Sequence, residues 1–559
     1  MKRQTARTAI AIAAVTALVG CGQGPAGEET EPPSREGEPS VPLEPEQALD
    51  GGDLVMALSQ EPDALDPTTA RTRAGRMVFE SMCEKLYDID AEGEIVPMLA
   101  SALPEFSDGD TVLTIPVRED AVFSDGTPLD AEAVEVSLAR HLEHDTSARS
   151  SDMGPVADVR VVGDHAVEIE LDEPFSPLLA SLSDRAGMIM SPTALEELGD
   201  DFAQNPSCVG PFKFDERVPQ TRISVVADPN YYDADQVRLD SIAYVIMPDN
   251  NIRSANLRSR DVHVTDTVSP QDFDALTQGE GTEVSPLVLD SLGFQGITVN
   301  VGNTDGVGQP AGEVDTLLAQ EPEVRRALSL AIDRENLVDV VFNGWYQSAC
   351  TPMSPISVFA DETATDCPPY DPEGAREILE GLGVEMPVTI ELTVQNNQDS
   401  LRYAQALQAS VQEAGFEIDV QPTEWTALLD AQARGDYEAV LVGWGGMVDP
   451  HSNMHNYLAS GSGNNYSGVS DEALDGDLNA ATRTVDHDER VALYASAVER
   501  TAELNPMIFT YRLANLGAVH ESVAGVWFSP DGILRLSRAA FVDPDAQADE
   551  IDVDDLSED

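Results

Sequence analysis

The chain has 559 residues, of which 42% are hydrophobic, and 32 Lys and Arg stand against 101 Asp and Glu for a formal charge of −69. The hydrophobic share can supply sizeable cores, which excludes a wholly disordered chain, and the length suggests several domain-sized units. A surface this acidic repels phosphate backbones and anionic lipid headgroups, so the composition argues against nucleic acid as a partner and against membrane docking through basic patches.

The N-terminal segment predicts export and a lipid anchor. Basic residues precede an apolar run at 9–19 that is too short to span a bilayer and is typical of a signal peptide. The run leads to Cys21 in a segment that resembles a bacterial lipobox; the alternative is an ordinary secretory peptide in which Cys21 is incidental. We therefore expect a lipoprotein signal peptide at 1–20, lipidation of Cys21 on the outer face of the cytoplasmic membrane, and a flexible tether at 21–50.

The stretch from about 54 to 250 has the short segments of mixed type that are typical of an α+β region. Alternating apolar and polar residues at 113–117 and 166–171 predict short strands. Residues 88–95 begin like a calcium-binding loop, but Leu99 occupies the place of the required bidentate Glu. A turn between two strands is therefore the better interpretation.

Two consecutive helices are predicted after this region. Pro322 opens the first, whose apolar residues fall on one face, and Asp333 caps the second, which runs to about Phe342. A third helix begins with Pro at its first position, after Asp371, and stops near Gly381 or Gly383.

Residues 371–444 predict a β-α-β-α-β unit with short connections, which requires a parallel sheet covered by helices. Strands are expected at 388–394, 416–421 and 437–444, and the two helices between them at 399–414 and from Thr423 to Gly435. Because ligands of open α/β sheets bind beyond the carboxyl ends of strands, Trp444 marks a candidate site.

The cysteines indicate disulfides. Four remain besides Cys21, an even number in a chain that is expected outside the cytoplasm. Three pairings are possible; Cys350 and Cys367 flank a short Pro-rich loop and could close it, and by elimination Cys83 would pair with Cys208. The alternative is free, buried cysteines. No cysteine or histidine spacing suggests zinc.

Catalysis has no positive support. The sequence lacks a nucleophile elbow, a phosphate-binding loop and a dinucleotide fingerprint. His451 and His455 are four residues apart without an HExxH motif, which favours surface or ligand-contact groups over a metal site. We therefore expect no enzyme activity, no cofactor and no metal.

Eight segments, in the right order, resemble those of bacterial extracellular solute-binding proteins of family 5, the peptide, dipeptide and nickel receptors of ABC importers. They lie at 51–67, 83–87 with 97–100, 123–128, 210–214, 324–334, 370–372, 443–444 with 449–450, and 505–506. Each match is weak alone, but their order makes the resemblance strong over about 51–535.

The resemblance implies an α/β, two-lobed periplasmic-binding-protein-like fold (type II, cluster C) with an extra α+β subdomain and a hinge, in a protein expected to be a monomer. The two crossings of the hinge are expected near Asn300 and Pro506. The expected boundaries are 51–80, 211–295 and 506–542 for lobe I, 81–210 for the inserted subdomain, 296–505 for lobe II and 543–559 for an acidic, fraying tail.

The resemblance also implies a ligand site. The residues that match the family's cleft are Trp444, Gly445, Asp449, Asn464, Asn465 and Tyr466. Dipeptide receptors commonly carry an Asp three residues after the Trp, as counter-charge for the ligand's ammonium, but here that position is Met447, so Asp449 is expected to serve or the ligand lacks a free amine there.

The implied function is capture of a peptide by lobe closure and its delivery to ABC permease subunits at the membrane. The alternatives are another solute (an oligosaccharide, a glutathione-like compound or a chelated metal) and a role as a solute sensor.

Overall fold

The computed structural model describes residues 38–279, 281–365 and 367–547, together with 551, 553 and 556. Its first large sheet has seven strands in the order β13 (Val284–Asp290), β20 (Ala514–His520), β12 (Val264–Thr265), β2 (Asp53–Leu58), β11 (Ser241–Ile246), β10 (Arg222–Ala227) and β9 (Phe212–Val218). The central strand β2 is almost wholly apolar and parallel to both its neighbours, as expected for a strand that is buried on both faces.

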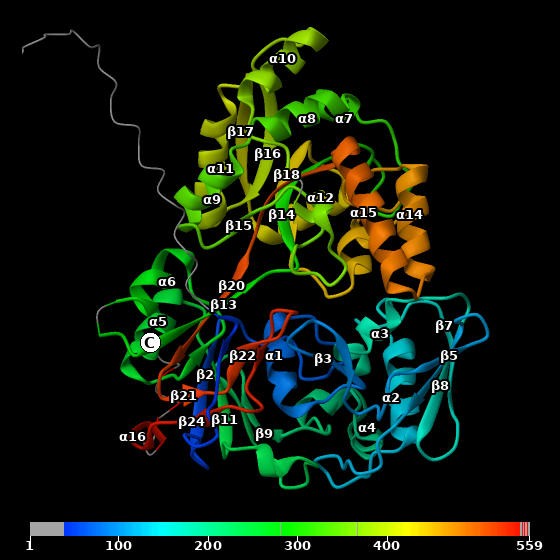
Figure 1. Cartoon of the computed structure of the whole chain (residues 1–559), viewed down its shortest axis with the longest axis vertical. Helices are drawn as coiled ribbons and strands as arrows, with labels where there is room; N and C mark the ends of the chain where they lie inside the picture. Colours follow the sequence, from blue (N-terminus) through cyan, green and yellow to red (C-terminus); the bar gives the residue numbers. More distant parts are fainter. Residues whose placement is uncertain are drawn as a thin grey trace, which may run out of the picture. The chain divides into compact units, whose positions relative to one another are not determined.

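We call this sheet and the elements packed on it lobe I (Figure 1). Its helices are α1 (Arg73–Met82), α5 (Asn250–Ser259), α6 (Pro270–Thr277) and α16 (Pro544–Gln547). Smaller sheets add β1 (Ser40–Val41), β22 (Val526–Phe528) and β23 (Leu534–Arg535), and β21 (Val523–Ala524) with β24 (Ala540–Phe541).

The second large sheet forms lobe II and has six strands. Their order is β15 (Gln347–Ser348), β19 (Met507–Arg512), β14 (Phe294–Val299), β18 (Ala439–Trp444), β16 (Val388–Gln395) and β17 (Phe416–Thr423). β16 is parallel to both β17 and β18, and α11 (Gln398–Val411) and α12 (Trp425–Arg434) connect these strands. The predicted β-α-β-α-β unit is confirmed.

Further helices cover lobe II (Figure 1). They are α7 (Leu317–Gln320), α8 (Pro322–Leu330), α9 (Arg334–Phe342), α10 (Pro372–Leu382), α13 (Asn456–Leu458), α14 (Glu472–Arg483) and α15 (His487–Leu504), with a π-helix at His451–His455. Both α8 and α10 carry Pro at their start, where the missing N–H costs no hydrogen bond, so the predicted beginnings of these helices are confirmed.

A third sheet lies within the expected subdomain. Its strands are β5 (Glu105–Ser107), β6 (Val112–Pro116), β8 (Ala166–Leu171) and β7 (Val156–Val161), accompanied by α2 (Ala131–Glu143), α3 (Leu178–Ser181) and α4 (Pro192–Leu198). β3 (Tyr87–Ile89) and β4 (Ile95–Pro97) form an antiparallel hairpin. The residues that resemble a calcium loop are therefore the turn of a hairpin, as predicted.

Both predicted disulfides are present. Cys83 bonds Cys208 and Cys350 bonds Cys367, with Cα–Cα distances of 4.9 and 5.4 Å. The first joins the end of α1 to a point 125 residues later, so it ties together the two chain segments that enter and leave the subdomain.

The connections between the two large sheets differ from the sequence-based boundaries. Residues 291–293 join β13 to β14 and Leu513 joins β19 to β20. The expected crossings near Asn300 and Pro506 are thus displaced, because β14 and β19 both belong to the lobe II sheet, where they pair with each other. β14 is preceded, and β19 is followed, by a strand of similar apolar character. A local sequence pattern therefore does not reveal which sheet a strand joins.

The expected tether at 21–50 also needs correction. Ser40–Val41 pairs with β22, and the Leu49 N–H donates to the Phe541 carbonyl at 2.9 Å. Val41 and Leu49 pack against the lobe I core, so the few apolar residues of this Pro-rich segment hold residues 38–50 on the protein. The expected signal peptide at 1–20 and the expected lipidation site Cys21 lie outside the described residues.

The acidic tail at 543–559 is corrected in part. Residues 544–547 form α16, Ala546 is 2% exposed, and the Gln547 amide donates to the Asp50 and Gly51 carbonyls at 2.7 and 3.1 Å. Among the described residues, no helix has the length and apolar character needed to cross a membrane.

Candidate functional site

The segment that follows β18 is held by one asparagine. Asn453 accepts hydrogen bonds from the Trp444 indole N–H at 3.0 Å and the Met447 N–H at 2.8 Å, and its own amide donates to the Met447 carbonyl at 2.6 Å. Trp444 also packs on Tyr457, with ring centroids 5.4 Å apart. These contacts fix the direction in which the chain leaves the strand.

Two glycines allow the crossing segment to approach this strand end. A Cβ on Gly446, which has a φ of +84°, would meet the Gly293 N at 2.2 Å, and one on Gly293 would meet the Trp444 carbonyl oxygen at 2.1 Å. Any side chain at either position would therefore push lobe II away from residues 291–293.

A cavity of about 430 Å³, which we call the arginine cavity, lies against Trp444. Lobe I contributes the start of α1 and the β19–β20 and 531–532 segments, and lobe II contributes Tyr346 and residues 444–447. The charged residues that line it are Arg71, Arg73, Arg76, Arg185 and Asp531. This volume falls within the range of small-molecule sites, which is roughly 300–1,000 Å³.

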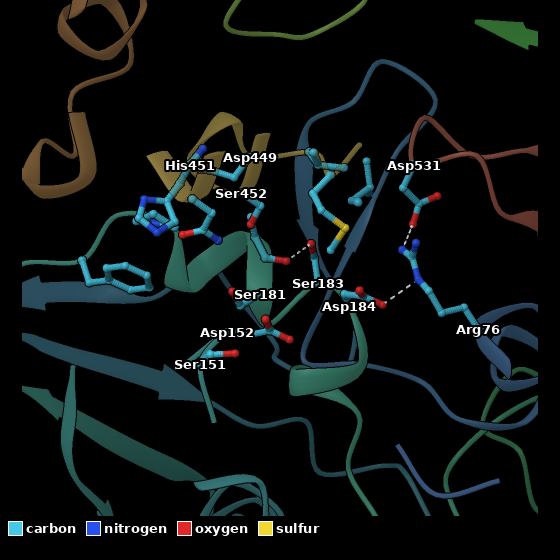
Figure 2. A pocket seen from close by; sticks show the side chains of 17 residues that line it. Arg76, Ser151, Asp152, Ser181, Ser183, Asp184, Asp449, His451, Ser452 and Asp531 are labelled. Atoms are coloured by element: carbon cyan, nitrogen blue, oxygen red, sulfur yellow. Dashed lines mark hydrogen bonds and ion pairs between the residues drawn. The ribbon is translucent and has the colours of Figure 1, made fainter. Parts of the chain in front are cut away.

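A second cavity, which we call the inner cavity, has a volume of about 120 Å³ and shares Arg76, Met447 and Asp531 with the first (Figure 2). Its other charged or titratable residues are Asp152, Asp184, Asp449 and His451. Burial, with the neighbouring His455, lowers the pKa of His451 to about 4, so this imidazole is neutral at pH 7.

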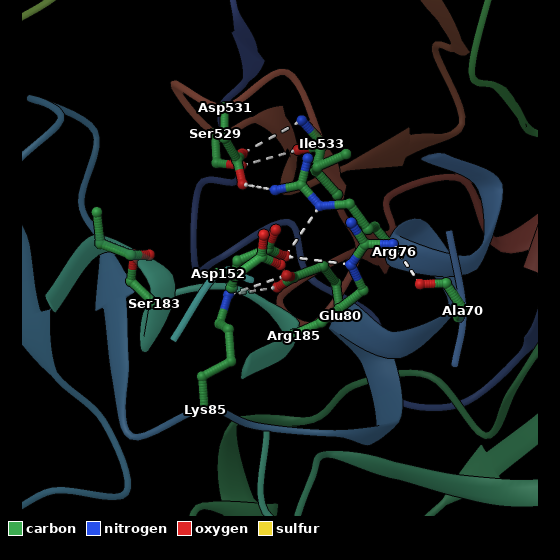
Figure 3. A network of polar contacts seen from close by, with 12 residues as sticks. Ala70, Arg76, Glu80, Lys85, Asp152, Ser183, Arg185, Ser529, Asp531 and Ile533 are labelled. Carbon is green, nitrogen blue, oxygen red and sulfur yellow. Dashed lines mark hydrogen bonds and ion pairs between the residues drawn. The ribbon is translucent and has the colours of Figure 1, made fainter. Parts of the chain in front are cut away.

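An ion-pair network underlies both cavities (Figure 3). Arg76 on α1 contacts Asp184 of the subdomain at 3.0 Å and Asp531 at 2.7 Å, and Lys85 contacts Glu80 at 2.9 Å. Burial alone would raise the pKa of Asp184, but the Arg76 and Arg185 guanidiniums outweigh it and hold that pKa well below its usual range. The network fixes α1 against the subdomain and against the 529–535 segment.

Within the described residues, no group of three His, Cys, Asp or Glu side chains is placed to hold a metal ion. The candidate site therefore consists of the arginine cavity, with Trp444 and Tyr346 in its lining, and the smaller, polar inner cavity. Elements of both lobes bound it.

The profile of the bacterial extracellular solute-binding proteins, family 5, matches residues 94–466. The chain belongs to this family. A glutathione-binding protein of Salmonella paratyphi A is 26% identical over 500 residues, which cover 87% of this chain and 93% of that protein. Di/tripeptide-binding protein 1 of Pseudomonas aeruginosa is 26% identical and covers 81% of this chain and 88% of its own length.

Solved structures agree on the fold of this family 5 protein. The oligopeptide-binding protein AppA of Bacillus subtilis, in complex with a nonapeptide, superimposes with a TM-score of 0.71 at 21% identity, over 88% of this chain and 99% of AppA. The predicted cluster C periplasmic-binding-protein fold is thus confirmed, and family membership confirms an extracytoplasmic, non-enzymatic solute-binding protein.

The residues predicted for the ligand site of this family 5 protein separate into two groups. Trp444 and Gly445 line the arginine cavity, and Asp449 lines the inner cavity. Both carboxylate oxygens of Asp449 accept from one Arg490 nitrogen at 2.8 Å, and the two residues are 6% and 5% exposed. A ligand ammonium would have to share this carboxylate with Arg490.

The other three predicted residues do not line either cavity. The Asn465 amide donates to the Ala459 and Val469 carbonyls at 3.1 and 2.8 Å, so it holds its own loop. Asn464 accepts from the Tyr466 hydroxyl at 3.4 Å, and Tyr466 lines a separate small cavity beside Tyr457.

The arginines at the start of α1, and Arg71 just before it, were not predicted as site residues. Three of the six residues at 71–76 are arginines, in a chain with 32 Lys and Arg among its 559 residues. That local enrichment, at the start of a helix that follows the central strand β2, is the signal that could have identified them.

Proposed function

We propose that this protein is the substrate-binding receptor of an ABC importer, that it captures peptides by lobe closure and that it delivers them to the permease. The observation that carries the proposal is a cavity that lies at the carboxyl end of β18, between elements of two lobes, and is walled by Trp444. The glutathione-binding and di/tripeptide-binding relatives support a short peptide or peptide-like solute.

The alternatives are a non-peptide solute, such as an oligosaccharide or a chelated metal, and a sensory role. The backbone rotations of lobe closure would take place in the two short crossings, residues 291–293 and Leu513, because hinges are usually a few residues at the ends of elements. Closure around a solute would bring Trp444 and the arginines of α1 into contact with the same molecule.

Replacement of Trp444 by Ala tests the site. We expect at least a tenfold loss of affinity for trialanine in calorimetry, because a wall that excludes water is removed. Trp425→Ala is the matched control, since Trp425 lies on α12 and is 42% exposed. Equal binding by wild type and Trp444→Ala would place the ligand elsewhere, and no binding of trialanine, glutathione or other short peptides by wild type would refute the peptide proposal.

We also propose that the mature protein is anchored by a lipid on Cys21. Cys21→Ala is expected to release the protein from the membrane fraction, because the acidic protein has no electrostatic affinity for anionic lipid. The measurement is an immunoblot of membrane and soluble fractions, with the Cys350→Ala/Cys367→Ala double variant as a control that stays membrane-bound. Membrane retention of Cys21→Ala would contradict the anchor.

A further inference from the structure

Arg71 and Arg73 differ from the other arginines of the cavity in having no carboxylate partner. Arg76 is paired with Asp184 and Asp531, and Arg185 lies 3.7 Å from Asp184. Among the described residues, neither Arg71 nor Arg73 has a carboxylate within ion-pair distance of its guanidinium, although acidic residues outnumber basic ones by 101 to 32 in this chain.

The hydrogen bonds of Arg73 are few for a half-buried guanidinium. One of its terminal nitrogens donates to the Asn515 side-chain oxygen at 3.0 Å and to the Gly532 carbonyl. Burial, with the nearby charge of Arg76, lowers the pKa of Arg73. The carboxylates of Asp266 and Asp531 act in the opposite direction but do not offset the burial, so the guanidinium is short of counter-charge. An anion at this position would relieve that cost.

The nearby carboxylate of Asp63 is already committed to the backbone. It accepts from the Arg71 N–H at 2.9 Å, the Thr72 N–H at 3.1 Å and the Thr72 hydroxyl at 2.8 Å. Asp63 therefore holds the segment that leads into α1, and these contacts are to the main chain and the Thr72 hydroxyl rather than to the two guanidiniums. The first turn of α1 contains no acidic residue, so the positive end of the helix dipole adds to their potential.

Several of the other residues that line the arginine cavity are apolar or aromatic. Leu292, Tyr346, Trp444 and Met447 line it together with main-chain atoms of the two glycines after Trp444. A solute that fits this lining combines an anionic group with a stackable or apolar body.

We infer that Arg71 and Arg73 form the anion subsite of this receptor and hold a carboxylate of the solute, the C-terminal carboxylate when the solute is a peptide. The inference rests on the proposed function, to which it adds the polarity and charge of the ligand. Arginine suits this role because its planar fork can hold a carboxylate through two parallel hydrogen bonds.

The test compares trialanine with its C-terminal amide by calorimetry. Wild type is expected to bind the acid about 10- to 100-fold more tightly than the amide, because hydrogen bonds between charged groups contribute about 1.5–3 kcal/mol. In Arg71→Gln and Arg73→Gln the affinity for the acid is expected to fall towards that of the amide, while the affinity for the amide is unchanged.

Arg258→Gln is the matched control, because Arg258 is an exposed arginine on α5 that donates a hydrogen bond to the Ala275 carbonyl at 3.2 Å. Unfolding temperatures of all variants establish that they fold. Equal binding of acid and amide by wild type, or an unchanged preference in both variants, would overturn the anion subsite and leave the peptide receptor intact.

Failure of wild type to bind either form, or any other short peptide, would refute the proposed function instead. In that case the anion subsite is tested by measuring the unfolding temperature of wild type with glutarate and with its diamide. A rise with glutarate but not with the diamide, and no rise in the Arg71→Gln/Arg73→Gln double variant, would support the subsite. No response to glutarate would overturn it.

Discussion

Asp449→Asn is expected to destabilise the protein by about 3–5 kcal/mol, the usual cost of leaving a buried charge without its partner. Arg490 would keep its hydrogen bonds to the Ala481 carbonyl and the Tyr494 hydroxyl, at 3.1 Å each, but would lose its counter-charge and one of its two oxygen contacts at residue 449. Asn keeps one oxygen that can accept from the His451 N–H at the start of the π-helix, so the expected loss comes from the ion pair. Chemical unfolding measures the loss.

A double variant, Asp449→Asn with Arg490→Met, separates the two roles of this carboxylate. Removal of both charges is expected to recover most of the stability, since buried ion pairs can often be replaced by apolar side chains. If peptide binding returns with stability, Asp449 acts by positioning the loop. A stable double variant that binds no peptide would show that the carboxylate contacts the ligand, and a stable single variant would contradict the ion-pair account.

Loss of the Cys83–Cys208 disulfide is expected to lower the free energy of unfolding by about 5 kcal/mol in the chain-entropy model, because it closes a long loop. The sulfurs are 125 residues apart in sequence and both cysteines are nearly fully buried. The variant is Cys83→Ala/Cys208→Ala, measured by unfolding under non-reducing conditions.

The Cys350–Cys367 disulfide supplies the control. It spans 17 residues, for which the same model gives about 3 kcal/mol. We expect a larger loss for the first pair and a loosening of the subdomain detectable by proteolysis. A smaller loss for the first pair would show that the subdomain is held mainly by its ion pairs and apolar contacts.

The parts of the fold that local pattern controls were predictable. At 388–394 the alternate residues Val388, Ile390, Leu392 and Val394 are buried and those between them face outward, so a single short segment identified a strand and its inner face. The parallel unit followed from the helical spacings between three such strands. Trp444 was nominated as a site residue because it ends the last of them, and it lines the arginine cavity.

Features made by distant residues were not predictable in this way. Arg73 meets Asn515 across 442 residues of sequence, and Arg76 meets Asp184 across 108. Asp449 was nominated because it is near Trp444, but its partner Arg490 lies on a helix that a local pattern does not connect to it. The lobe boundaries were displaced for the same reason, because strand pairing between β14 and β19 is also long-range.

Native mass spectrometry of protein purified without unfolding can identify the solute itself, because closed receptors often retain it. We expect a bound molecule that fragments into amino-acid residues and carries a free carboxylate, and we expect it to be lost from Arg71→Gln/Arg73→Gln. A bound sugar, a metal chelate without peptide bonds or a neutral solute would contradict this expectation.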